Sequence, residues 1–378
     1  MHKSSKVIYL DNNATTPPAP EVVREMIICL KNNFGNPSSS HPYGQRARKT
    51  VENGRQQVAD LIHGKPHEML FTSGGTEANN LAILGTALRY RSGHMISSCI
   101  EHPSVMNPLH YLEGLGFTAT YLPVDKYGIT DPALLKKHIQ KNTILITIMH
   151  SNNETGSIQP IAEIGKIAQS SGIVFHCDAA QSAGKIPVNV RGLNVDLLTV
   201  VSHKFYGPKG IGALYIKNGI ELKPILYGAS HERGLRPGTE NVASIAGLGK
   251  AAEIAKKEMR KRVSGMRELT NIFYNELRRE IPGIRLNGHR TKRLPNTLNV
   301  SFPNAYGSHL LDRVKDTIAA STGSACHEGR HTPSSVLTAM GLSNEQALSA
   351  VRFSVGRQTT LRELRKAAKN IVKAYRGI

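Results

Sequence analysis

Cysteine is scarce in this sequence of 378 residues, and its placement argues against two kinds of site. No two cysteines form a CxxC pair, and none has the spacing of a metal-binding cluster. We therefore expect neither a disulfide framework nor a metal site. The four cysteines are Cys29, Cys99, Cys177 and Cys326.

Long apolar runs are also missing. The longest nearly apolar runs cover residues 143–149 and 195–201, whereas a membrane span needs roughly 20 residues. The basic amino-terminal segment has no apolar stretch of signal-peptide length and passes directly into an expected strand. The sequence thus predicts a soluble, cytoplasmic protein without a membrane anchor.

Acidic residues are few compared with basic ones. The chain has 28 Asp and Glu against 48 Lys and Arg, which gives a formal net charge of +20. A charge of this size favours acidic partners, including nucleic acid. However, tryptophan is absent, only 5% of the residues are aromatic, and the basic residues are scattered rather than gathered in a block. No motif indicates nucleic-acid binding, so this function ranks as an alternative, with an accessory contact left open.

The composition and the periodicity predict an α/β protein with two domains. Hydrophobic residues make up 39% of the chain, enough for a real core, and about 150 residues per domain suggests two domains. Strands are expected to alternate with helices, which is typical of a mostly parallel sheet covered on both faces. The expected strands are 69–72, 95–99, 119–124, 144–149, 173–177, 197–201 and 212–216, and the expected helices are 76–90, 103–115, 132–139 and 160–170.

The pattern changes after about residue 240. A long helix is expected over 241–280, followed by Pro282 and Gly283. Strands at 297–302 and 350–355 and a final amphipathic helix at 363–375 then predict a smaller α+β domain. We expect residues 16–255 to form the large domain, and residues 1–15 with 256–378 to form the small one.

Polar and small residues follow the expected strands, where a parallel sheet places its ligand. Residues 73–77 read Ser-Gly-Gly-Thr-Glu at a helix start, which suits a phosphate, although a plain helix cap explains the same string. His102 precedes another helix and could equally be a cap residue. Asp178 is expected at a buried strand end, where a carboxylate needs a cationic partner. Lys204 follows the next strand, where burial would favour a neutral, nucleophilic amine.

These features together match the requirements of one cofactor. Pyridoxal 5'-phosphate needs a lysine for its Schiff base, an acid that keeps its pyridine nitrogen protonated, and a phosphate site. Lys204, Asp178 and residues 73–77 would supply these three groups.

Nine motifs are distributed along the whole chain. They are YLDNNATTP (9–17), GNPSSSH (35–41), FTSGGTEANNLAI (71–83), NNETG (152–156), HCDAAQSAGK (176–185), SHKFYGPKGIGALY (202–215), LRPGTEN (235–241), STGSACH (321–327) and RFSVGRQTT (352–360). Together these motifs resemble the cysteine desulfurases of the class V aminotransferase-like family, in the branch with a long cysteine loop. They are also similar to selenocysteine lyases.

This resemblance implies the fold type I of pyridoxal-phosphate transferases, with a seven-stranded sheet in the large domain. It implies that Lys204 forms the Schiff base and removes the substrate Cα proton, and that Asp178 protonates the pyridine nitrogen. His102 would stack on the ring and assist proton transfer, and Gln181 would donate to the phenolic oxygen. The remaining implied site residues are Gly75, Thr76, Ser202 and His203 at the phosphate, Asn153 near the ring, and Arg352, Asn153 and Asn13 at the substrate.

Two further implications concern a second subunit and the acceptor of sulfur. Thr239 would reach the phosphate of the neighbouring subunit, so the resemblance implies a homodimer. Cys326 would attack the sulfur of L-cysteine, hold it as a persulfide and leave L-alanine. An acceptor protein, acidic in view of the net charge, would then take the sulfur for iron-sulfur cluster assembly or thiolation.

The residues around Cys326 support this assignment independently. A free cysteine is usually a small buried hydrophobe, but the stretch around Cys326 is polar and contains Gly323 and Gly329. Nearby positive charge would favour the thiolate; it comes from His327, Arg330 and His331.

The sequence departs from the long-loop pattern in two places. The residues after Cys326 read HEGRH, which is closer to the selenocysteine-lyase pattern than to a Ser-rich loop, and Ser202 stands where many relatives have glycine. Selenocysteine lyase, or a desulfurase dedicated to tRNA or DNA sulfur modification, is therefore the alternative interpretation.

Overall fold

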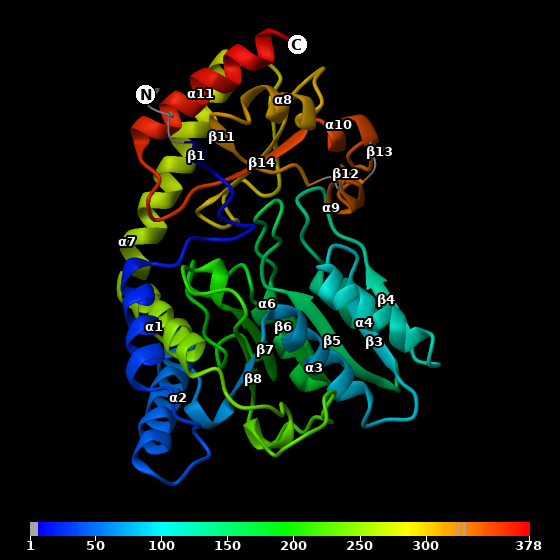
Figure 1. Cartoon of the computed structure of the whole chain (residues 1–378). Helices are drawn as coiled ribbons and strands as arrows, with labels where there is room; N and C mark the ends of the chain where they lie inside the picture. Colours follow the sequence, from blue (N-terminus) through cyan, green and yellow to red (C-terminus); the bar gives the residue numbers. More distant parts are fainter. Residues whose placement is uncertain (1–6, 324–325, 328–329) are drawn as a thin grey trace.

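A large α/β sheet domain lies below a smaller α+β unit in the computed structural model (Figure 1), which describes residues 7–323, 326–327 and 330–378. The central sheet has seven strands in the order β2-β8-β7-β6-β5-β3-β4. Only β8 runs antiparallel to its neighbours. The strands are β2 (Met69–Thr72), β3 (His94–Ser98), β4 (Thr118–Leu122), β5 (Thr143–Met149), β6 (Val174–Asp178), β7 (Leu197–Val201) and β8 (Gly212–Ile216). The predicted mostly parallel, seven-stranded sheet is confirmed.

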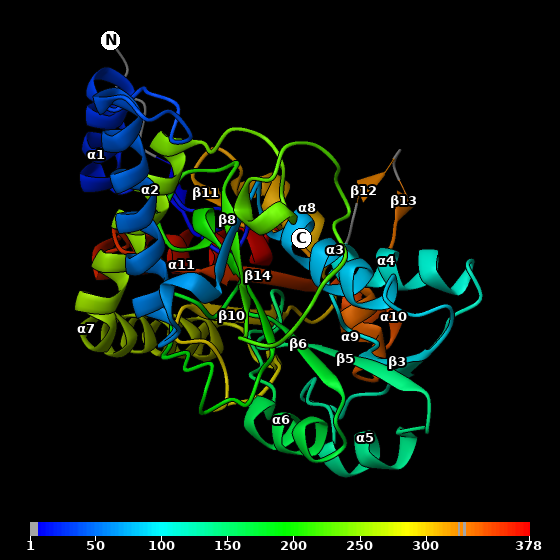
Figure 2. The same ribbon diagram turned by 90° about the horizontal axis from the view of Figure 1, so that it is seen from below.

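Alternate residues of these strands enter separate cores on the two faces of the sheet. In β5, Leu145 packs on one face while Ile146 and Ile148 pack on the other. Because both faces are buried, the strands are nearly continuous apolar runs, which explains why their positions are predictable from sequence. Helices cover both faces (Figure 2). They include α3 (Gly75–Ala87) and α4 (Pro103–Glu113) on one side, and α5 (Pro132–His138) and α6 (Ile161–Ser170) on the other.

Helices α1 (Pro20–Asn32) and α2 (Pro42–Leu61) were not predicted from the sequence. The buried face of α2 consists largely of small residues, so few large apolar side chains mark this helix in the sequence. Two glycines allow its close approach to the long helix α7 (Val242–Glu280): a side chain at Gly54 would collide with Ile245, and one at Gly249 would collide with Gly54. Tertiary packing rather than local hydrophobic periodicity therefore selects this helix.

The carboxyl-terminal part of the chain forms the α+β unit. Its three-stranded antiparallel sheet has the order β14-β10-β9, and β1 pairs with β11 in parallel. Helix α11 buries a stripe at positions 364, 367, 368, 371 and 372, the spacing of an amphipathic helix. The elements are β1 (Ile8–Tyr9), β9 (Arg285–Asn287), β10 (Thr297–Ser301), β11 (Ile318–Ala319), β14 (Ala350–Ser354), α8 (Gly307–Val314) and α11 (Leu361–Arg376).

Helix α7 connects the two units along one side of the molecule (Figure 1). Its first half packs into a core built from residues between 19 and 255, and its second half packs into a core built from residues 8–10 and 266–372. We propose that these cores are the two domains expected from sequence, with a boundary inside one continuous helix.

A short segment of the carboxyl-terminal region packs on the large sheet instead. Val336 and Leu337 of α9 (Ser335–Ala339) join Ile100 and Met149 in one apolar cluster, which also includes part of α10 (Asn344–Leu348). The preceding hairpin pairs β12 (Cys326–His327) with β13 (Arg330–His331). Helix α9 is thereby held against Ile100 and Met149, at the edge of the large sheet from which the site residues project.

Candidate functional site

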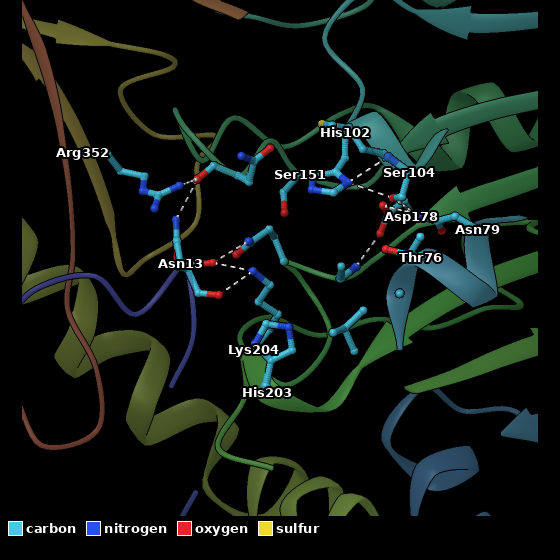
Figure 3. A pocket seen from close by; sticks show the side chains of 17 residues that line it. Asn13, Thr76, Asn79, His102, Ser104, Ser151, Asp178, His203, Lys204 and Arg352 are labelled. Carbon is cyan, nitrogen blue, oxygen red and sulfur yellow. Dashed lines mark hydrogen bonds between the residues drawn. The ribbon is translucent and has the colours of Figure 1, made fainter. Parts of the chain in front are cut away.

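The carboxyl ends of the parallel strands surround a polar cavity of about 420 Å³ (Figure 3). Asp178 is the last residue of β6, rather than the residue after it as expected. Lys204 lies in the short turn after β7, and Asn153 follows β5. The cavity brings together ten of the predicted site residues: Asn13, Gly75, Thr76, His102, Asn153, Asp178, Gln181, His203, Lys204 and Arg352.

The other three predicted site residues either do not line this cavity or have no described side chain. Ser202 does not line this cavity: it is fully buried, and its hydroxyl has no hydrogen-bond partner among the described residues. It points toward Gly207, where any side chain would collide with it. Thr239 lines a separate cavity of about 260 Å³. Cys326 is described only through its backbone pairing with His331, and Gly329 lies outside the described residues.

The amine of Lys204 is held by two main-chain oxygens. Its Nζ donates to the carbonyls of Asn13 and Ala14, each at 2.8 Å. Burial, with a further contribution from Arg352, lowers the pKa of Lys204 to about 8, although Asp178 and Asp11 oppose the shift. A large fraction of this amine is therefore neutral in mildly alkaline solution, the form that attacks a carbonyl group.

A chain of hydrogen bonds joins the buried Asp178 to His102. Asn79 Nδ2 donates to Asp178 Oδ2 and to Ser104 Oγ, both at 2.8 Å. Ser104 Oγ lies 2.8 Å from His102 Nδ1, and the Ser104 main-chain N–H donates to the same nitrogen at 3.1 Å. Because Nδ1 accepts, the neutral imidazole carries its proton on Nε2. Burial lowers the pKa of His102 and favours this neutral form.

The amino-terminal end of α3 forms another wall of the cavity. The first N–H groups of a helix have no intrahelical partner and attract anions. Glycine at position 75 avoids a close contact, since a Cβ there would lie 2.6 Å from Val201 Cγ2 and would displace it. Glu77 in this first turn accepts from Ser73 N at 2.7 Å and pairs with Arg236 Nε at 3.0 Å. The latter contact ties the segment that carries Thr239 to the start of α3.

Arg352 is a buried cation with an unused donor. It is 8% exposed, pairs with Asp11 at 2.8 Å, and donates to the Asn153 carbonyl at 3.1 Å. Its Nε has no partner among the described residues. A guanidinium group with a free, buried N–H suits a carboxylate ligand.

His203 contributes a neutral imidazole to the wall. Its Nδ1 lies 3.1 Å from Thr15 Oγ1, and its main-chain oxygen accepts from Thr16. Burial, with Lys204 and Lys209, lowers the pKa of His203 to about 4. This side chain can therefore donate a hydrogen bond to an anion near neutral pH but brings no charge to it.

The structure adds residues to the site that the sequence did not single out. Asn79 and Ser104 link Asp178 to His102, Asp11 pairs with Arg352, and Lys185 lies buried beside Gln181. Asn79 follows Gly75 by four residues, so helical spacing would have placed both on one face. The other three partners depend on the tertiary fold and had no comparable signal.

The residues present fit pyridoxal 5'-phosphate. The cavity contains a lysine with a lowered pKa, a buried carboxylate, a helix amino terminus and an imidazole. The Arg352 guanidinium, which also lines the cavity, suits the carboxylate of an amino acid. Within the described ranges, no three His, Cys, Asp or Glu side chains cluster closely enough to hold a metal ion, and no helix has the length and apolarity to cross a membrane.

We predict that Arg352→Gln raises the pKa of the Lys204 amine in cofactor-free protein. Removing the guanidinium eliminates one cationic neighbour and frees the Asp11 carboxylate, and both changes favour the ammonium form. The pH dependence of Lys204 acetylation by a small anhydride, followed by mass spectrometry, should shift upward. Arg365→Gln on the exposed face of α11 is the control and should leave the profile in place. An unchanged profile in Arg352→Gln contradicts the assigned electrostatic role.

Comparisons with known proteins agree with this geometry. The family model "Aminotransferase class-V" matches residues 8–366. Cysteine desulfurase IscS of Dictyoglomus turgidum is 48% identical over 94% of this chain and 91% of its own length. Cysteine desulfurase IscS of Pseudomonas entomophila is 46% identical over 97% of this chain and 92% of its own length. A solved NifS-like protein superposes with a TM-score of 0.93 at 35% identity, covering 99% of this chain and 100% of its own. The structure titled "SspA in complex with cysteine" superposes with a TM-score of 0.82 at 37% identity, covering 92% of this chain and 99% of its own. The chain belongs to the class V aminotransferase family and, within it, to the pyridoxal-phosphate-dependent cysteine desulfurases.

Proposed function

We propose that this enzyme converts L-cysteine to L-alanine and transfers the sulfur to Cys326 as a persulfide. The observation that carries the proposal is one cavity lined by Lys204, Asp178, the start of α3 and Arg352. The curated relatives named above are cysteine desulfurases, and they do not favour selenocysteine lyase as the main activity.

The cavity residues divide into those that hold the cofactor and those that hold the substrate. Asp178 would keep a proton on the pyridine nitrogen, and His102 would stack on the ring. Gln181 Nε2 would donate to the phenolic oxygen, while the N–H groups at the start of α3, the Thr76 hydroxyl and His203 would bind the phosphate. Arg352 would bind the substrate carboxylate near Asn13 and Asn153, which are the remaining polar groups at that end.

The reaction then requires proton movement at two atoms and one sulfur transfer. The bound cofactor supplies an electron sink for the charge that develops at the substrate Cα. Lys204 Nζ removes the Cα proton, a step for which its lowered pKa is suited. The Cys326 thiolate forms an S–S bond with the substrate sulfur as the Cβ–S bond breaks, and the released electron pair is protonated at Cβ. Lys204 Nζ then returns a proton to Cα. The products are L-alanine and a Cys326 persulfide.

The two ends of the cysteine segment are attached to the cavity wall. Ser321 exchanges main-chain hydrogen bonds with Arg352, at 3.2 and 2.7 Å. Glu154, next to the wall residue Asn153, accepts from Ser334 Oγ at 2.6 Å, and its carboxylate packs so closely on Gly323 that a side chain there would collide with it. These attachments bracket Cys326 and support its delivery to the substrate.

An acidic acceptor protein would collect the sulfur in the cytoplasm. The cavity residues account for little of the net charge of +20, because most basic residues lie outside the cavity. A basic surface attracts an acidic partner and speeds its encounter. Delivery to iron-sulfur cluster assembly or to a thiolation protein fits this charge.

A homodimer would complete the phosphate site. Thr239 lies away from the cavity of its own subunit, on a segment anchored at the start of α3. Exposed apolar side chains on and near α1 offer a contact surface: Leu30 is 65% exposed and Phe34 is 67% exposed. An apolar hollow of about 670 Å³ lies beside them. Apolar patches of this kind mark protein contacts.

Replacing Cys326 should separate cofactor chemistry from sulfur transfer. We expect Cys326→Ala to bind pyridoxal phosphate normally and to lose alanine and sulfide formation from L-cysteine, because the thiolate acceptor is gone. Cys29→Ala is the matched control and should retain activity, since Cys29 is buried in α1. Wild-type protein should prefer L-cysteine over L-selenocysteine. Sulfide release by Cys326→Ala, or rejection of L-cysteine by the wild type, overturns the proposal.

Removing the Glu154 attachment should slow sulfur transfer without loosening the cofactor. A hydrogen bond to a charged group contributes about 1.5–3 kcal/mol, so Glu154→Ala should reduce the single-turnover rate of persulfide formation by about tenfold or more. Glu154→Gln keeps an oxygen acceptor for Ser334 and should recover part of the rate. Equal rates in all three proteins mean that this contact does not position Cys326.

Subunit mixing tests the position of Thr239. Lys204→Ala removes the reactive amine, and Thr239→Val should weaken cofactor binding. If Thr239 serves the partner, a mixed dimer contains one site with both residues intact, so activity at limiting pyridoxal phosphate should rise when the two inactive or weakened proteins are mixed. No gain on mixing, or a mass of 41.2 kDa in solution, contradicts the shared site.

A further inference from the structure

A second lysine lies beside the cavity and has no part in the mechanism above. Lys185 is 7% exposed and does not line the cavity wall. Its Nζ donates to Gln181 Oε1 at 2.7 Å and to Asn13 Oδ1 at 3.0 Å. Both acceptors are amide oxygens, and no carboxylate lies within ion-pair distance among the described residues.

This environment suits an uncharged amine. Burial, together with Lys204 and Arg352, places the pKa of Lys185 well below its ordinary value. A neutral amine has two N–H donors, and the two amide oxygens use both of them. A lysine retained in the interior as a neutral donor pair costs less than a buried ammonium without a counter-ion.

Lys185 contacts the oxygen end of the Gln181 amide. Its donor occupies Oε1, so the NH₂ group of Gln181 is directed the other way, where it donates to the Asn13 carbonyl at 3.0 Å. That carbonyl also accepts from Lys204 Nζ at 2.8 Å. Gln181 lines the cavity, and its Nε2 thus lies beside the reactive amine.

The same lysine fixes the side chain of Asn13. Asn13 Oδ1 accepts from Lys185 and from Asn296 Nδ2, both at 3.0 Å. The opposite end, Nδ2, donates to Thr297 Oγ1 at 2.8 Å and to the Asn153 carbonyl at 3.1 Å. With both ends occupied, the Asn13 main chain that holds Lys204 has little freedom to move.

We infer that Lys185 is a positioning residue that orients the Gln181 amide, so that Nε2 is presented to the phenolic oxygen of the cofactor, and fixes Asn13 beneath the Lys204 amine. The inference rests on the proposed function, since it assigns Gln181 to the cofactor. A space-filling role for the four-carbon stem is the competing explanation, and it makes a different prediction for an apolar residue of similar size.

The test is a pH titration of the cofactor's visible absorption band in holoenzyme. A donor to the phenolic oxygen stabilises its ionised form, so losing the donor should move the titration midpoint to higher pH by roughly half to one unit. Lys185→Met keeps the length of the side chain without a donor and should produce this shift. Lys185→Gln retains a donor and should give a smaller shift. Lys217→Met, at a lysine paired with Asp196, is the control and should leave the midpoint unchanged.

A double variant shows whether the effect passes through Gln181. Gln181→Met should shift the midpoint by itself, and adding Lys185→Met should change it little further. An unchanged midpoint in Lys185→Met, or an equal additional shift in the Gln181→Met background, overturns the inference. If Lys185→Met fails to fold, Lys185→Leu serves as the second apolar variant, and an unchanged midpoint in it supports only a space-filling role and also overturns the inference. Wild-type protein that binds no pyridoxal phosphate refutes the proposed function instead, so the two failures are distinguishable.

Discussion

Asn13 makes the contacts on which the rest of the site depends. Its main-chain oxygen accepts from Lys204 and Gln181, and its side chain bonds to Thr297 on β10 of the carboxyl-terminal unit. Its main-chain N–H donates to Ser354 Oγ on β14 at 2.8 Å. One residue of the amino-terminal segment therefore connects the reactive amine of the large domain to the small-domain sheet. A shift between the two cores would move the acceptor that holds Lys204.

The cavity is cationic, and its charge adds to burial in shifting the pKa of its lysines. Burial and the Arg352 guanidinium lower the pKa of Lys204 and of the nearby Lys185, while Asp178 and Asp11 oppose the shift of Lys204. Such a cavity stores an electrostatic cost that an anionic ligand relieves. A phosphate at α3 and a carboxylate at Arg352 would supply the missing negative charge. The excess of basic residues elsewhere on the chain is a separate feature and concerns the partner.

The sequence predicted the parts of the site that lie at ends of buried strands. Asp178 and Lys204 could be predicted because buried parallel strands are continuous apolar runs whose ends are easy to locate. Strand β6 ends at Asp178 itself, one residue later than expected. The residue pattern also offered His102, whose role came from the family resemblance, and family motifs added Gln181 and Arg352; all three reach the same cavity. Ser202 was expected at the phosphate but is buried against Gly207, because the turn after β7 folds its hydroxyl inward.

Lys185 and Asp11 could not be singled out, since a lysine in a turn and an aspartate near the amino terminus acquire their roles only through burial and distant partners. Helix α2 escaped prediction for a related reason, because its packing face is made of small residues.

We propose that Lys204, rather than its buried neighbour Lys185, is the amine that bonds to the cofactor. Borohydride reduction of the holoenzyme fixes the cofactor covalently to the amine that carries it, and peptide mass mapping then identifies that residue. We expect the added mass on the peptide that contains Lys204 and its absence after Lys204→Ala. The same mass on the peptide that contains Lys185 or Lys209, or no added mass on any peptide, would contradict it.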